Sequence, residues 1–140
     1  MLNLDANKTN RHAIAFIGFG EVGQRFARDL LRNPAVRITA YDILFGQASG
    51  KPLENSARGL GVLTARSAMD ACKSADVIIS AVTASQAEIV AQGAGHYLTA
   101  GQILLDINSA APSTKQRSAL HVEKAGAHYV EGAVMAAVLK

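Results

Sequence analysis

The chain has 140 residues, of which 49% are hydrophobic and 18% are charged, and this composition is typical of one globular domain rather than of a disordered chain. Its net charge of +3 comes from scattered basic residues, its aromatic content is 5% and no apolar run reaches bilayer length, so neither nucleic acid nor membrane is expected as a partner. The single cysteine, Cys72, cannot form an internal disulfide, and residues 1–12 read as a flexible tail without a signal peptide, which together predict a cytoplasmic protein.

A glycine-rich segment between a strand and a helix is the main motif of the chain. Residues 13–17 form a continuous apolar run, as expected for a strand buried on both faces. Residues 22–32 follow the motif with helical spacing, and residues 36–41 form a second strand that ends at Asp42, about 20 residues beyond the glycines. This order is the dinucleotide-binding βαβ fingerprint. The motif itself consists of Gly18, Phe19, Gly20, Glu21, Val22 and Gly23.

The motif residues and Asp42 are expected to bind the cofactor. Gly18 would permit a tight turn, Gly20 would let a pyrophosphate approach the backbone, and Gly23 would let the helix pack against the sheet. The pyrophosphate would lie at the helix N-terminus, and Asp42 would accept hydrogen bonds from ribose hydroxyl groups. The alternative is that the glycines only form a turn and Asp42 only ends a strand.

Asp42 also bears on the choice of cofactor. An ionised Asp42 would repel a 2′-phosphate, and Ile43 follows where an arginine would suit NADP, so NAD is favoured over NADP. Lys51 and Arg58 could nevertheless turn toward such a phosphate.

The remaining pattern predicts an α/β fold, a Rossmann-type doubly wound parallel sheet in three α/β/α layers. On the first helix, Val22, Phe26 and Leu30 are expected on one apolar stripe, with Gly23 and Ala27 beside them. Gly93 and Gly95 are expected to mark the end of a later helix. The other predicted elements are a short helix near residues 53–58, strands at 62–64, 76–82, 102–107 and 128–130, and helices at 85–91 and 112–126.

Four segments in order resemble the β-hydroxyacid dehydrogenases, the family of 3-hydroxyisobutyrate and 6-phosphogluconate dehydrogenases. They are residues 17–23, 75–83, 106–112 and 129–134. The resemblance covers the chain from about residue 13 to its end and implies an NAD(P)-binding Rossmann domain over residues 13–140. The implied reaction is hydride transfer between a hydroxyacid-type alcohol and nicotinamide.

The resemblance also implies roles for residues that follow the later strands. Val82 and Thr83 would line the cofactor, and Ser109 would approach its nicotinamide end. Asn108 and Ser109 would lie near the substrate. Ser109 could instead cap the helix that begins at Pro112, or do both.

Two departures from the family lead us to expect a chain that is catalytically incomplete. Met135-Ala136-Ala137 replaces the family's substrate-holding Ser-Gly-Gly, and the catalytic lysine of the family belongs to a helical C-terminal domain that this chain lacks. Lys140 does not match that lysine. We therefore assign no catalytic residue and no metal ligand, and a hydroxyacid would bind only if a second domain were supplied. None of the histidines is expected to be catalytic: His12, His96, His121 and His128.

Other interpretations remain open at this point. The apolar residues 133–139 could pair with a second copy to form a homodimer. The chain could also be a stand-alone dinucleotide-sensing regulatory module, or another Rossmann protein such as a methyltransferase that binds S-adenosylmethionine.

Overall fold

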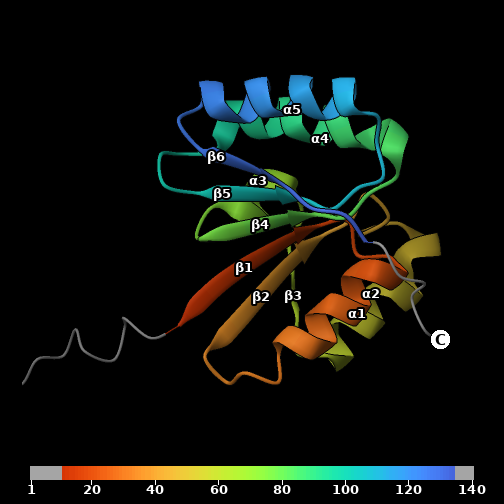
Figure 1. The fold of residues 1–140 in the computed structure, drawn as a ribbon. Helices are drawn as coiled ribbons and strands as arrows, with labels where there is room; N and C mark the ends of the chain where they lie inside the picture. Colours follow the sequence, from red (N-terminus) through yellow and green to blue (C-terminus); the bar gives the residue numbers. More distant parts are fainter. Residues whose placement is uncertain (1–10, 135–140) are drawn as a thin grey trace, which may run out of the picture.

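The computed structural model describes residues 11–134, which form a three-layer α/β/α structure around one six-stranded sheet (Figure 1). The strands are β1 (His12–Ile17), β2 (Val36–Tyr41), β3 (Leu63–Thr64), β4 (Val77–Ser80), β5 (Ile103–Asp106) and β6 (His128–Glu131). The helices are α1 (Glu21–Leu30), the short 3₁₀-helix η2 (Ala48–Gly50), α2 (Lys51–Gly59), α3 (Ala68–Cys72), α4 (Ala84–Tyr97) and α5 (Pro112–Lys124).

All neighbouring strands in the sheet are parallel, and their order is β3-β2-β1-β4-β5-β6. This order is that of the dinucleotide-binding Rossmann fold, so the predicted fold class is confirmed. The chain order reverses between β1 and β4, where Ile14 to Ile17 lie opposite Val77 to Ser80. In open sheets of this kind, ligands bind at the carboxyl ends of the strands beside this switch point.

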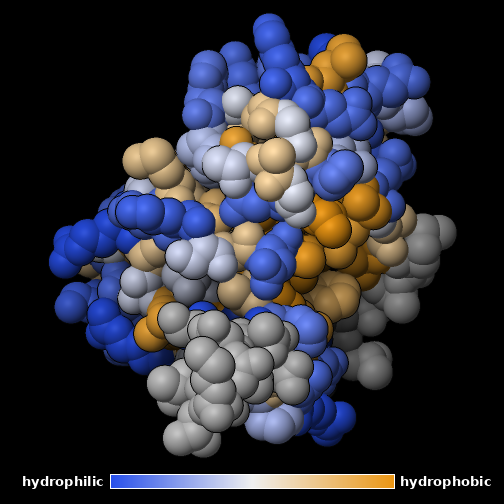
Figure 2. Space-filling model, turned by 90° about the vertical axis from the view of Figure 1, so that its left-hand side faces the viewer, coloured by the Kyte–Doolittle hydropathy of each residue, from blue (hydrophilic) through white to orange (hydrophobic). Residues whose placement is uncertain are grey.

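Each face of the sheet is covered by its own helices. Figure 1 shows α4 and α5 above the sheet and α1 and α2 below it. Ile78 and Leu104 point toward the first pair, while Phe16 and Ile38 belong to the core on the α1 side. Figure 2 views the molecule from the amino ends of the strands and shows a hydrophobic area at the level of the sheet between two more polar layers.

The buried face of α1 is centred on the two small residues beside the expected stripe rather than on Phe26. Gly23 and Ala27 are its buried residues, whereas Phe26 is 39% exposed. A Cβ atom at Gly23 would lie 2.9 Å from the carbonyl oxygen of Gly18, so the helix lies too close to the turn for a larger residue. The small side chains therefore set the contact face, and Phe26 is displaced to its rim.

The prediction that Gly93 and Gly95 end a helix at residue 91 is wrong, because α4 continues to Tyr97. The two glycines lie inside the helix. A Cβ atom at Gly95 would come within 2.5 Å of the carbonyl oxygen of His121 in α5. Gly95 is thus required for the close approach of two helices rather than for a helix end.

Some expectations concern residues that the structure does not describe. They are the tail over residues 1–10 and the apolar, dimer-forming stretch from residue 135 onward, including the Met135-Ala136-Ala137 segment. His12, which was expected in the tail, is the first residue of β1. Among the helices formed by residues 11–134, none has the length and apolar character to cross a bilayer.

Candidate functional site

The turn between β1 and α1 depends on glycine at its first position. Gly18 has a φ of +89°, a left-handed conformation that strains other residues. A Cβ atom there would lie 2.2 Å from the carbonyl oxygen of Ala81, just beyond β4. The predicted tight turn at Gly18 is therefore confirmed, and it lies directly against the exit of β4 at the switch point.

Gly20 has no such structural reason to be glycine. Its φ of −70° suits every residue type, and a Cβ atom there would meet no atom within 4 Å. Gly20 is the N-cap residue of α1, and no side chain of residues 11–134 caps the helix at this position. The missing side chain leaves open space at the N-terminus of α1, the positive end of the helix dipole, where the first N–H groups have no partner within the helix.

Asp42 holds this turn in place. Its Oδ2 atom accepts a hydrogen bond of 2.8 Å from the Phe19 N–H, and its Oδ1 atom accepts one of 3.0 Å from the Leu44 N–H. The Phe19 side chain is buried in the core, edge-on to Phe16 at a ring distance of 6.1 Å. Phe19 can thus face a ligand only through its backbone, and its N–H is already bound to Asp42.

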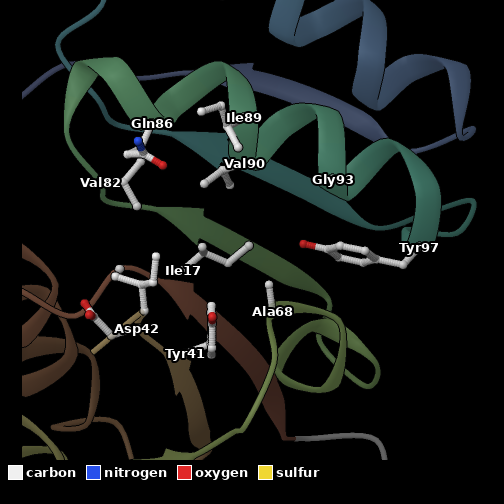
Figure 3. Close-up of a pocket in the computed structure, with 12 residues that line it drawn as sticks. Ile17, Tyr41, Asp42, Ala68, Val82, Gln86, Ile89, Val90, Gly93 and Tyr97 are labelled. Atoms are coloured by element: carbon white, nitrogen blue, oxygen red, sulfur yellow. The ribbon is translucent and has the colours of Figure 1, made fainter. Parts of the chain in front are cut away.

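A mostly apolar cavity of about 470 Å³ lies on one side of the turn, and we call it the tyrosine cavity. Figure 3 shows Val90 and Tyr97 on α4 opposite Tyr41 and Asp42 at the end of β2, with the Tyr97 hydroxyl directed toward the middle of the cavity. The other lining residues are Ile17, Gly18, Ile43, Ala68, Val82, Gln86, Ile89 and Gly93.

A second cavity of about 320 Å³ lies on the other side of the turn, and we call it the serine cavity. It is formed by Val22 of α1 and by residues that follow β4, β5 and β6. Val82 lines both cavities and is the wall between them. The remaining lining residues are Ala81, Thr83, Ala84, Ile107, Asn108, Ser109 and Val134.

Asn108 has a structural role at this edge. Its side chain is only 4% exposed, its Oδ1 atom accepts a hydrogen bond of 2.7 Å from the Val82 N–H, and its Nδ2 atom donates one of 2.9 Å to the Ser80 hydroxyl. The amide therefore ties the exits of β4 and β5 together and positions Val82. This geometry does not support the predicted contact of Asn108 with a substrate.

Ser109, in contrast, is exposed and free to meet a ligand. The N-cap residue of α5 is Ala111, and no side chain of the described residues caps that helix. The structure therefore does not show the helix cap that was one of the two predicted roles of Ser109. Thr83, at the N-cap position of α4, lies within 3.2 Å of the Ser85 hydroxyl and shares the serine cavity with Ser109.

Two buried charged residues at the same edge were missed by the sequence reasoning. Asp106 accepts hydrogen bonds from the Asn108 N–H at 2.8 Å and from the Tyr129 hydroxyl at 2.7 Å. Burial, together with this carboxylate, raises the pKa of Tyr129. Lys115, also buried, donates to the Gly132 carbonyl at 3.0 Å. The position of Asp106 at the end of an apolar strand could have indicated a role at this edge. Nothing in the local pattern around Lys115 distinguishes it from a surface lysine.

With this geometry established, the chain can be compared with known proteins. A family model described as NADP oxidoreductase, coenzyme F420-dependent, matches residues 13–110. The chain belongs to this family. The match spans the glycine turn, Asp42, Val82 and Ser109. Most of the residues that line the two cavities at the carboxyl edge of the sheet therefore lie within the matched part of the chain.

Three relatives extend this comparison. A conserved hypothetical protein of Sinorhizobium meliloti 1021 is 34% identical, with a TM-score of 0.86 over 99% of this chain and 46% of its own. The 3-hydroxyisobutyrate dehydrogenase of Mycobacterium tuberculosis, solved with L-serine, is 20% identical, with a TM-score of 0.79 over 91% and 42%. An uncharacterised 28.5 kDa protein of Methanothermus fervidus is 29% identical over 79% of this chain and 41% of its own.

The second of these structures confirms the predicted resemblance to 3-hydroxyisobutyrate dehydrogenase in the fold. The chain spans less than half the length of each of the three. As a member of the NADP oxidoreductase family with this fold, it is a nicotinamide-dinucleotide-binding domain of an oxidoreductase.

In the described part of the chain, the serine cavity has no ionisable side chain in its lining. None of its lining residues is an acid, a base or a thiol. Burial raises the pKa of the Cys72 thiol to about 12, and a hydrogen bond with Tyr97 offsets part of this rise. Cys72 is thus a neutral core residue at physiological pH. Residues 11–134 bring no three metal-ligating side chains together.

Proposed function

We propose that the chain binds a nicotinamide dinucleotide along the carboxyl edge of the sheet and serves as the cofactor half of an oxidoreductase. The adenosine would occupy the tyrosine cavity, the diphosphate would lie at the glycine turn, and the nicotinamide would occupy the serine cavity. The observation that carries this proposal is the pair of unlike cavities on either side of the turn, with Val82 as their common wall.

The tyrosine cavity suits a flat, largely apolar base. Ile43 is 71% exposed and Ile89 is 57% exposed, and both line the cavity. Covering such side chains contributes about 25 cal/mol for each Å² of apolar surface removed from water. Asp42 lies at the same cavity, and a carboxylate offers about four lone-pair sites, two of which remain after its two backbone contacts. These sites would accept hydrogen bonds from the ribose hydroxyl groups.

The glycine turn suits a diphosphate. The uncapped N–H groups at the start of α1 and the positive end of its dipole favour an anion. The open space above Gly20 gives that anion access to the backbone. Glu21, in the first turn, stabilises the free helix by the same dipole interaction, and its exposed carboxylate can turn away from a bound anion.

The serine cavity suits the nicotinamide. Val22 and Ile107 provide apolar contact for the ring, and the Thr83 and Ser109 hydroxyl groups can bind its carboxamide. The bound ring supplies hydride transfer. Since no described residue of the cavity ionises, the group that exchanges the alcohol proton must come from outside it. We propose a small hydroxyacid as the substrate of the whole protein, which fits the L-serine in the dehydrogenase neighbour.

Asp42 favours NAD in this proposal. Its negative charge opposes a 2′-phosphate held directly beside the ribose. Titration of the chain with NAD and NADP side by side would measure this preference. We expect tighter binding of NAD, and tighter binding of NADP would contradict the assigned role of Asp42.

The test of the proposed site uses Gly20. We expect Gly20→Val to weaken binding of NAD and NADP by at least about tenfold, or 1.4 kcal/mol, because the new side chain fills the space above the N–H groups. Gly59→Val is the matched control, since a Cβ atom at Gly59 also meets nothing within 4 Å and lies outside both cavities. Calorimetry measures the affinity, and circular dichroism checks that both variants remain folded.

Unchanged dinucleotide affinity in the Gly20→Val variant would contradict the proposed position of the diphosphate. Binding of S-adenosylmethionine without binding of either dinucleotide would contradict the proposed cofactor.

A further inference from the structure

Lys115 is a buried cation outside the lining of both cavities. It is the fourth residue of α5 and is only 6% exposed. Ser118 and Val122, the other buried residues of this helix, lie on the same stripe. The Nζ atom of Lys115 donates its hydrogen bond of 3.0 Å to the carbonyl of Gly132, the residue directly after β6. The ammonium group thus connects α5 to the exit of β6, which runs alongside this helix (Figure 1).

The stability of the fold does not require a charge at this position. Burial of an ammonium group is unfavourable unless hydrogen bonds or a counter-ion compensate it. Among residues 11–134, no carboxylate lies within 4.0 Å of Lys115, and its one hydrogen-bond acceptor is the neutral Gly132 carbonyl. The positive end of α5 is also close, which disfavours a cation. An apolar side chain of similar length would avoid these unfavourable interactions, so the lysine indicates a role for its charged hydrogen bond.

The backbone of Gly132 is held from two sides. Its N–H donates a hydrogen bond of 2.8 Å to the Asp106 carbonyl, which continues the pairing of β5 with β6 by one residue. Its carbonyl accepts from Lys115, and a hydrogen bond from a charged donor is stronger than one between neutral groups. A Cβ atom at Gly132 would lie 3.4 Å from the side chain of Ile107, which lines the serine cavity. The exit of β6 is therefore fixed close to this cavity.

The chain reaches the serine cavity two residues after Gly132. Val134 is partly buried and lines this cavity together with Ile107. The path of the backbone from Gly132 to Val134 sets the position of this part of the wall. Lys115 restrains the start of that path from the side of α5.

We propose that Lys115 is a positioning residue of the nicotinamide site. Its ammonium group fixes the Gly132 carbonyl, the backbone after Gly132 places Val134, and Val134 contacts the nicotinamide ring. Without the hydrogen bond, Val134 moves and the ring binds more weakly. The adenosine and the diphosphate keep their contacts, because they lie on the other side of Val82. This role rests on the proposed function, which places the nicotinamide in the serine cavity.

The experiment replaces the ammonium group with an apolar side chain of similar length, in the variant Lys115→Met. Lys124→Met is the matched control, since Lys124 is an exposed lysine of the same helix. Calorimetry measures the affinity of the full chain for NAD and for ADP-ribose, which lacks the nicotinamide. NMR spectroscopy of the Val134 methyl groups in the free protein reports on the position of the wall.

We expect Lys115→Met to lose at least about fivefold in affinity for NAD and less than about twofold for ADP-ribose. The Val134 methyl signals should shift in this variant before any ligand is added. Lys124→Met should change neither the ratio of the two affinities nor the methyl signals. The proposal is overturned if either readout of Lys115→Met equals that of the control, because a residue that only stabilised the fold would leave both unchanged.

Lys115→Leu is a second apolar replacement, which takes the place of Lys115→Met if circular dichroism shows that the methionine variant is unfolded. The same two readouts apply to it. If neither variant folds, the ammonium group holds the fold itself, and the positioning role is overturned.

The ADP-ribose titration separates this role from the proposed function. Failure of the unaltered chain to bind NAD and ADP-ribose would contradict the dinucleotide site itself. Equal affinity of the unaltered chain for the two ligands would contradict the placement of the nicotinamide in the serine cavity. A preference for NAD that survives in Lys115→Met would contradict only the role of Lys115.

Discussion

The Asp42 carboxylate accepts hydrogen bonds from the Phe19 and Leu44 backbones, so it joins the β1–α1 turn to the exit of β2. The sequence indicated an acid at the end of the second strand, which could either end the strand or bind a ribose. Both roles use the carboxylate oxygens of Asp42. The contact that ends the strand also presents the carboxylate at the mouth of the tyrosine cavity. A structural role and a proposed binding role thus coincide in one side chain.

We expect Asp42→Ala to lower the free energy of unfolding by about 1–3 kcal/mol, because two backbone N–H groups lose a charged acceptor. It should weaken NAD binding as well. Asp29→Ala, which removes an exposed carboxylate of α1, is the control and should change stability by less than about 0.5 kcal/mol. Urea denaturation measures the first effect and calorimetry the second. Equal stability of the two variants would show that the Asp42 contacts do not hold the turn in solution.

Single residues could be predicted where the cause is local. The left-handed turn at Gly18 follows from a motif six residues long. The burial of Asn108 could not be predicted in this way, because its partners, Ser80 and Val82, are more than 25 positions away in the sequence. The same limit applies to Lys115, whose partner is the carbonyl of Gly132.

Among the elements, α4 shows most clearly how a correct local rule can fail. Glycine commonly follows the last turn of a helix, so two glycines in three residues predicted an end. The helix continues to Tyr97, and Gly95 lies inside it where α5 packs too closely for a side chain. Packing between elements far apart in the sequence therefore overrode local helix propensity.

The two glycines of α4 should respond differently to the same substitution. Gly95→Ala places a Cβ atom 2.5 Å from the His121 carbonyl and is expected to destabilise the protein by about 1–3 kcal/mol. Gly93→Ala is the matched control, since its nearest neighbour would be a Tyr97 ring carbon at 3.9 Å. We expect it to raise stability by up to about 1 kcal/mol, because alanine favours helix over glycine. Thermal unfolding followed by circular dichroism compares them. Equal melting temperatures would contradict the tight α4–α5 contact.

At the scale of the whole molecule, the sheet could be predicted because its central strands are continuous apolar runs between turn residues. β3, with only two residues, was located by the pattern, but its place at the edge beside β2 follows from pairing that periodicity does not encode. The two cavities were beyond prediction in detail, since each combines residues from several elements. What the sequence did indicate was the edge of the sheet where they lie.

Burial of Cys72 should make the free energy of unfolding of the domain fall at alkaline pH. The folded pKa is about 12 against an ordinary value of 9.0, so above pH 9 only the unfolded chain releases the thiol proton. The contribution of this thiol to the free energy of unfolding should therefore be constant below pH 9 and fall by up to about 1.4 kcal/mol for each pH unit between 9 and the folded pKa. Urea denaturation between pH 8 and 10 measures this slope.

Cys72→Ala should flatten that slope, because alanine carries no titrating group. Burial also raises the pKa of Tyr97 and Tyr129, so these residues add to the loss of stability at still higher pH. An identical pH dependence in the Cys72→Ala variant would contradict the assignment of the slope to this thiol.

The reversal of strand order between β1 and β4 divides the sheet into two halves that meet along one seam. Asp42 belongs to one half, and Ser109 belongs to the other. A molecule long enough to reach from the first to the second would bridge that seam. Each half would then restrain the other through the bound molecule as well as through the hydrogen bonds between the two central strands.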